Sequence, residues 1–278
     1  MPSTVGSVGT VADPDIAALL GTYDAQLRAH VPDRLPAGVR VERDGPLLRF
    51  VGFGDRGAVV YRDLGGLDGS ELDELIAAQV RIFAERGEPF EWKLHGHDRP
   101  PDLAERLRAA GFVAEELETV VIGPVAAVAV EARLPEGVTL REVRERVDLE
   151  RIAAMEEAIW TSDQSVRADE LEKELVADPE GLEVVVAEAG GVAVCAGWVR
   201  FPSGTEFATL WGGSTLPEWR RRGIYGALVA YRANLAAQRG LRYVQVDASA
   251  DSRPILERLG FVAVTTTTPF VWTPPLTA

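Results

Sequence analysis

The chain has 278 residues, 46% of them hydrophobic, and its 43 acidic residues exceed its 29 basic residues, giving a formal net charge of −14. This length and hydrophobic content disfavour a mainly disordered chain and predict one large or two ordinary globular domains. The acidic balance disfavours nucleic acid and anionic membranes as partners and is compatible with a cationic partner such as an amine.

The first half alternates between helical and strand patterns. Its longest helical segment has apolar residues at spacings of three and four and is stopped by Gly87. In chain order we predict a helix over 15–30, strands over 47–52 and 58–63, a helix over 69–86, a strand over 90–95, a helix over 103–110 and a strand over 118–123.

The second half begins after a segment rich in alanine and valine, 124–136, which we interpret as the crossing between the halves. Asp148 is placed to be the N-cap of the first long helix that follows. The predicted elements are a strand over 138–141, helices over 148–160 and 169–176, paired strands over 182–189 and 192–200, a strand over 207–215, a helix over 224–239, a strand over 243–248, a helix over 252–259 and strands over 265–268 and 270–272.

The two halves repeat the same order of sequence features. In each, a long helix ends in Arg-Gly, a strand follows, and a short helix containing Glu-Arg-Leu is closed by Gly-Phe-Val. This pattern indicates an internal duplication, although β-α-β-α units commonly look alike. The matching segments are Arg86-Gly87 and Arg239-Gly240, Glu105–Leu107 and Glu257–Leu259, and Gly111–Val113 and Gly260–Val262.

Several classes of site and location are disfavoured. The single cysteine, Cys195, lies in an apolar run, which indicates a buried structural thiol rather than a nucleophile. No His/Cys group has the spacing of a zinc site. No apolar run reaches the ~18 residues that span a bilayer, and a secretory signal pattern is missing. We therefore predict a cytoplasmic protein without a metal.

The segment L-P-E-W-R-R-R-G-I-Y-G-A-L places three arginines and a glycine between a predicted strand and a helix. The first amides of a helix have no partner within it and lie at the positive end of its dipole, so they favour anions. A glycine lets an anion approach the main chain, and arginines add forked donors. The segment therefore indicates a phosphate site, with solvated arginines at an ordinary helix start as the alternative.

In its context, this segment resembles the GNAT acyltransferase superfamily. The resemblance covers residues 137–273, in which hairpin, strand, turn, helix and closing Gly-Phe follow the family's order. The family pattern of Arg or Gln, two free positions, Gly, one free position, then Gly or Ala falls on Arg220, Gly223 and Tyr225, of which only Tyr225 departs. The resemblance implies an α/β (α+β) fold of two GNAT-like domains, 1–130 and 137–278. Each has a mixed, mostly antiparallel twisted sheet flanked by helices, and the N-terminal copy is degenerate.

The resemblance also implies the cofactor and its contacts. Acetyl-CoA would be the acyl donor, with main-chain amides around the turn on its pyrophosphate and the strand end along its pantetheine arm. Gly212 and Gly213 suit the bulge that the family carries in this strand. The expected cofactor-binding residues are Gly213, Ser214, Thr215, Arg220, Arg221, Arg222, Gly223, Ile224, Tyr225, Gly226 and Ser252.

The catalytic residues that the resemblance implies are largely replaced. The strand position where family members often place a base is Thr209, and Glu206 is the nearest carboxylate, so Glu206 is the candidate base, acting through water. The positions of the family's usual Tyr acid and Asn are Leu256 and Ser249. We therefore predict an N-acyltransferase acting on a small-molecule or peptide amine, and keep as an alternative a non-catalytic acyl-CoA sensor or scaffold.

The first half has D-L-G-G-L-D-G-S at the turn that corresponds to the arginine segment, and its aspartates would oppose phosphate. We expect no CoA there. His95, His97, Asp98 and Arg99 form the densest polar cluster of the chain. This cluster is interpreted either as part of an acceptor site between the halves or as a loop that caps the next helix. The sequence gives no indication of the oligomeric state or of the acyl chain length.

Overall fold

The computed structural model describes residues 15–52, 55–160 and 164–275, and the following elements lie in those ranges. The first half contains α1 (Ile16–Gln26), β1 (Arg40–Asp44), β2 (Leu47–Val51), β3 (Gly57–Val60), α2 (Gly69–Arg86), β4 (Phe90–His95), α3 (Leu103–Ala109), β5 (Val113–Ala114), β6 (Glu118–Pro124) and α4 (Val125–Val128). The second half contains β7 (Val138–Val143), α5 (Arg146–Trp160), α6 (Ser165–Ala177), β8 (Leu182–Ala189), β9 (Val192–Arg200), β10 (Phe207–Thr215), a 3-10 turn η1 (Pro217–Trp219), α7 (Ile224–Gln238), β11 (Tyr243–Ala248), α8 (Arg253–Arg258) and β12 (Val262–Trp272).

Most predicted elements are present, with one wrong cap and one wrong break. Helix α5 begins at Arg146, so Asp148 lies inside its first turn and is not its N-cap. The Asp148 carboxylate is instead occupied by Arg141 and Arg151, at 2.8 and 3.0 Å. The two strands predicted over 265–268 and 270–272 are parts of the single strand β12.

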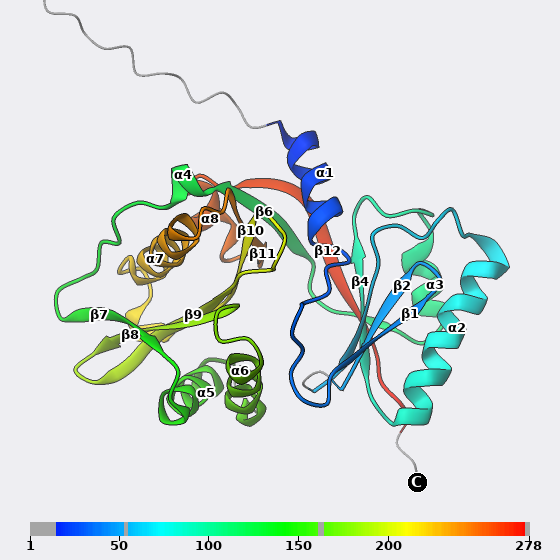
Figure 1. Cartoon of the computed structure of the whole chain (residues 1–278), viewed down its shortest axis with the longest axis horizontal. Coiled ribbons are helices and arrows are strands. Elements are labelled where there is room, and N and C mark those ends of the chain that lie inside the picture. Colours follow the sequence, from blue (N-terminus) through cyan, green and yellow to red (C-terminus); the bar gives the residue numbers. More distant parts are fainter. Residues whose placement is uncertain (1–14, 53–54, 161–163, 276–278) are drawn as a thin grey trace, which may run out of the picture.

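All the strands in the described ranges belong to one mixed sheet of 12 strands (Figure 1). Its strand order is β1-β2-β3-β4-β12-β6-β11-β10-β9-β8-β7, and β5 pairs with β12. Only the β3–β4 and β10–β11 pairs are parallel, which confirms the predicted mixed and mostly antiparallel sheet. Each parallel pair is connected by a long helix, α2 or α7, so the two halves repeat the same unit.

The halves exchange their last strands at the centre of this sheet. β6, from the first half, pairs with β11 of the second half. β12, from the second half, pairs with β6 and then with β4 and β5 of the first half. Phe270 and Trp272 of β12 are consequently buried in the aromatic core of the first half. The domain division at 1–130 and 137–278 stays a prediction, and the strands of the two segments are interlocked.

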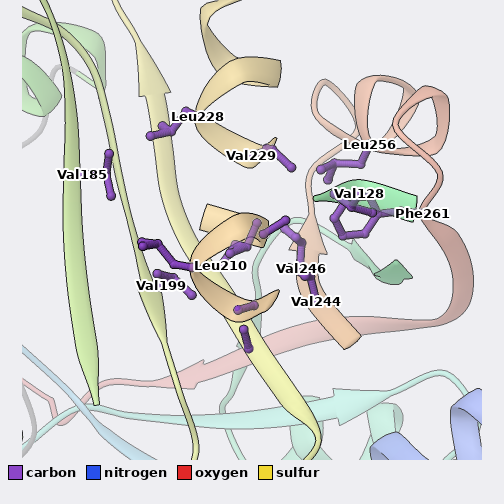
Figure 2. Packing of buried hydrophobic residues seen from close by; sticks show 14 of the residues in the cluster. Val128, Val185, Val199, Leu210, Leu228, Val229, Val244, Val246, Leu256 and Phe261 are labelled. Atoms are coloured by element: carbon purple, nitrogen blue, oxygen red, sulfur yellow. The ribbon is translucent and has the colours of Figure 1, made fainter. Parts of the chain in front are cut away.

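Helices cover both faces of the second half. α4, α7 and α8 pack on one face through a core that includes Leu228 and Val246, and Figure 2 shows part of that core. α5 and α6 pack on the opposite face through alternate residues of the same strands, such as Val184 and Val186. Cys195 is buried in the first of these cores, as predicted, and burial raises the pKa of its thiol to about 11. None of the helices in the described ranges has the length and apolar content needed to cross a bilayer.

Candidate functional site

The central strands β10 and β11 separate along their length. They pair only from Phe207–Thr209 to Tyr243–Gln245. Beyond Thr209, the register of β10 continues with β9 alone, while β11 continues with β6. A split therefore opens between β10 and β11 toward their carboxyl ends, where ligands of open α/β sheets commonly bind.

A bulge shapes the β10 side of this split. The β9–β10 register shifts between Gly212 and Ser214, so Gly213 has no partner residue on β9. Gly212 and Gly213 have φ values of 67° and 89°, a region that favours glycine. The bulge that the glycine pair predicted is therefore present, and it turns the main chain of Gly213 out of the ladder.

A buried arginine of α7 holds this bulge in place. Arg232 is 1% exposed, and its Nη1 donates to the carbonyl oxygens of Trp198 at 3.0 Å and Trp211 at 2.9 Å. Among the described residues no carboxylate is paired with it, and burial lowers its pKa. Sequence reasoning missed this residue, although a charged side chain inside the apolar run of a helix was a usable signal.

The arginine segment forms a tight turn that leads into α7. Arg220 fastens the turn to β10, because its Nε donates to the carbonyl oxygen of Thr215 at 3.0 Å. Arg221 has a φ of 61°, rare for a residue other than glycine. Gly223, with a φ of 81°, is the N-cap of α7. The guanidinium of Arg222 stacks on Trp219 at 4.6 Å from the ring centroid.

This turn leaves a row of main-chain donors without partners. Ala227 is the first residue after the turn whose N–H donates, and its acceptor is the carbonyl oxygen of Gly223. Within the described ranges, the amides from Arg221 to Gly226 donate to no group. The three arginines of the turn are exposed, so positive charge surrounds these amides. Unpartnered amides with positive charge around them are the features by which helix N-termini bind anions.

The expected cofactor-binding residues come together, but not all their side chains face the split. Gly213 contacts the ring of Tyr225, and the Tyr225 phenol interacts with Ser252 at the start of α8. The Ile224 side chain is in the core, so only its main chain is available to a ligand. Ser214 turns to the opposite face, where its hydroxyl donates to Glu156 at 3.1 Å.

Glu206 lies at the end of β10 away from the split. Its carboxylate accepts from Gln26 at 2.9 Å and from Arg242 at 2.5 Å, and these two contacts hold its pKa below the ordinary value. A carboxylate with this geometry is a poor acceptor for a substrate proton. The structure thus does not favour Glu206 as the base.

The replaced family positions have packing roles. Leu256 is fully buried beside Val128 and Phe261 in the core under α7 and α8 (Figure 2). The Ser249 and Ser252 hydroxyls are 3.1 Å apart at the start of α8. The phenol of Tyr231 donates to Glu142 at 2.8 Å, and Tyr243 packs on Phe207.

The sheet face opposite α7 carries polar side chains beside the split. By strand register, Thr209, Gln245, Asp247 and Glu118 share this face. Asp247 accepts from Lys93 at 2.5 Å and from Gln245 at 2.7 Å. Burial raises the pKa of Glu118 from 4.5 to about 7, and the nearby Lys93 partly offsets this effect. A surface hollow is lined by Glu115, Glu116, Leu117, Glu118, Ser249 and Pro269.

The His95 cluster fastens α1 to the sheet. His95 Nε2 lies 3.0 Å from the Tyr23 hydroxyl of α1, and Asp98 accepts from Arg28 and Tyr61, each at 2.6 Å. Burial lowers the pKa of His95 to about 2, which keeps its ring neutral. The interpretation that this cluster caps the next helix is wrong, because the N-cap of α3 is Asp102. Among the described residues, no group of His, Cys, Asp and Glu is arranged to hold a metal ion.

Comparisons with known proteins agree with this architecture. Residues 149–261 match the model of the acetyltransferase (GNAT) family. No curated protein sequence matches the chain. A GCN5-related N-acetyltransferase from Kribbella flavida has a similar structure, with a TM-score of 0.62, 19% sequence identity and 94% of each chain covered.

A tandem GNAT protein from the clavulanic acid biosynthesis pathway is also similar, with a TM-score of 0.59, 15% identity, and 88% of this chain and 86% of that chain covered. A protein of unknown function from Staphylococcus epidermidis reaches a TM-score of 0.65 at 12% identity, covering 91% of this chain and 98% of that one. At these identities the structures establish the shared fold, and the family model establishes the domain type. Residues 149–261 therefore form an acetyltransferase domain of the GNAT family, within a fold shared with a tandem GNAT protein.

Proposed function

We propose that the second half binds acetyl-CoA at the turn between β10 and α7 and transfers its acyl group to an amine. The observation that carries this proposal is the row of unpartnered amides from Arg221 to Gly226, beside a split in the sheet. These amides would hold the pyrophosphate, and Arg221 and Arg222 would add charge. Gly213, Ser214 and Thr215 would offer main-chain groups to the pantetheine arm, as an added strand does.

The reaction itself needs no covalent enzyme intermediate. The amine nitrogen attacks the thioester carbonyl carbon, the carbon–sulfur bond breaks, and the thiolate leaves with the electron pair. The amine proton passes to a base, and the thiolate takes up a proton. Main-chain donors at the bulge and the nearby Arg232 charge would favour the negative charge that develops on the carbonyl oxygen.

We infer that the amine approaches from the face opposite α7. Glu115, Glu116 and Glu118 line a hollow at the start of β6, and this acidic lining suits a cationic acceptor. Glu118 replaces Glu206 as our candidate base, because burial brings its pKa to about 7 and a base near the working pH is the most effective. The acceptor would be a small-molecule or peptide amine.

A second function, acyl-CoA binding without turnover, is favoured by one observation. Leu256, at the position of the family's usual acid, is buried in the core and has no group that could protonate the thiolate. A sensor or scaffold would need the cofactor site but not this acid. The two functions differ in whether thiol is released when an amine is added.

Calorimetry with acetyl-CoA tests the cofactor site. Reversing the charge of Arg221 and Arg222 together, Arg221→Glu with Arg222→Glu, should weaken binding at least about tenfold, or about 1.4 kcal/mol. The matched control makes the same charge change at Arg43 and Arg62, which are exposed in the first half. Equal affinity of both double variants would reject the site. Thiol release over a panel of amines then separates transferase from sensor.

A further inference from the structure

Tyr225 lies across the mouth of the split on the side of α7. It is in the first turn of α7, and its ring rests on the bulge: a Cβ placed on Gly213 would be only 2.7 Å from its Cε2. At its other end, the phenol interacts with Ser252, which precedes α8 and follows β11. The side chain therefore reaches from β10 to the segment that continues β11.

This position conflicts with the proposed path of the cofactor. The pyrophosphate site lies at the start of α7, and the bulge at Gly213 is where the pantetheine arm would run along β10. An arm that passes from one to the other must cross the surface of Gly213, which the Tyr225 ring now covers. Two groups cannot occupy one contact surface, so the ring and the arm exclude each other.

The other two tyrosines of α7 and β11 do not lie over Gly213. Tyr231 is bonded to Glu142, and Tyr243 packs on Phe207. Around Tyr225, the facing groups are Ser252, the Cys195 thiol and the guanidinium of Arg232. The ring also packs against the edge of the core under α7, but it is only partly buried, so rotation about χ1 would carry it toward solvent while α7 stays in place.

We propose that Tyr225 controls entry of the pantetheine arm, so that acetyl-CoA binds with full strength only when its ring has left Gly213. The proposal rests on the cofactor site described above. The nucleotide part of the cofactor binds outside the ring and does not sense it. The apparent affinity for the whole cofactor is reduced by the fraction of molecules in which the ring is displaced.

The test compares two ligands by calorimetry: 3′-phospho-ADP, which lacks the pantetheine arm, and acetyl-CoA. Tyr225→Ala removes the ring and Tyr225→Phe keeps it. Tyr225→Leu is a second truncation that preserves apolar packing if the alanine variant folds poorly. We expect all these proteins to bind 3′-phospho-ADP equally. The alanine and leucine variants should bind acetyl-CoA about tenfold or more tightly than the parent, and the phenylalanine variant within about threefold of it.

Three results would overturn the role proposed for Tyr225. Equal nucleotide binding with no gain for acetyl-CoA in the truncated variants would overturn control by Tyr225 and leave the cofactor site standing. A gain in Tyr225→Phe as large as in Tyr225→Ala would also overturn it, because the ring would not be the obstacle. Failure of every variant, and of the parent, to bind 3′-phospho-ADP would overturn both the site and the role of Tyr225.

Discussion

Substituting Phe270 tests whether the exchanged strand β12 holds the first half together. Phe270 is 1% exposed, lies opposite Trp92 on β4, and has the Arg108 guanidinium 5.3 Å from its ring centroid. Removing a buried phenylalanine ring costs about 3–5 kcal/mol in lost transfer free energy and cavity formation. We therefore expect Phe270→Ala to lower the free energy of unfolding by about that amount, although the residue lies in the second half of the sequence.

Urea unfolding followed by tryptophan fluorescence and by far-UV circular dichroism measures this effect. Because β6 and β12 each complete the sheet of the other half, we expect both probes to give one shared transition. Val271→Ala, the next residue of the strand, serves as the control and should cost about 1 kcal/mol, since Val271 is only partly buried. A loss below about 1 kcal/mol for Phe270→Ala would refute the interlocked arrangement. Separate unfolding transitions for the two halves, of which the substitution shifts only that of the second half, would refute it as well.

Two further predictions concern the split. Gly212→Ala should destabilise the protein by more than about 2 kcal/mol and abolish acetyl-CoA binding, because its Cβ would lie 2.6 Å from the Trp198 ring. The control is Gly204→Ala, since Gly204 has a similar φ but open space around it. In chemical denaturation this control should show only the backbone cost of about 1–2 kcal/mol. Glu118, whose pKa is raised to about 7, holds a proton in the folded protein that the unfolded chain has lost, so stability should fall as pH rises from 4.5 to about 7. Glu118→Gln should remove this dependence of stability on pH in unfolding measurements. With Glu118 as the base, it should also remove the rise in the rate of thiol release that has its midpoint near pH 7. An unchanged pH dependence of thiol release in Glu118→Gln would contradict the role of Glu118 as the base.

Local sequence patterns predicted most helices and strands of this fold, but they did not predict which strands pair with each other. Apolar spacing located α2 and α7, and Gly87 at the end of α2 has the left-handed conformation that its position implied. The polar strand β1, Arg40–Asp44, was missed because an edge strand with little burial lacks an apolar pattern. The exchange of β6 and β12 was also missed, since a strand's periodicity specifies its faces but not its neighbours.

The residues of the candidate site also differ in whether the sequence could identify them. Gly223 and the glycine pair of β10 were recognisable because glycine suits a turn and a bulge, and Arg220 was recognisable from the family pattern. The roles of Arg232 and Tyr225 depend on contacts with a different strand, and Glu118 comes from the other half of the chain. Such contacts arise from tertiary packing, which residue spacing along the chain does not contain.

The crossing of β6 and β12 also orders the events of protein synthesis. The ribosome makes the first half well before it reaches Trp272, so during that interval β4 has no neighbour on one side and its aromatic core is unsealed. A nascent chain of this kind exposes apolar surface and an open strand edge, the features that engage chaperones or lead to aggregation. Translation through β12 is therefore the step that closes the half that was made first.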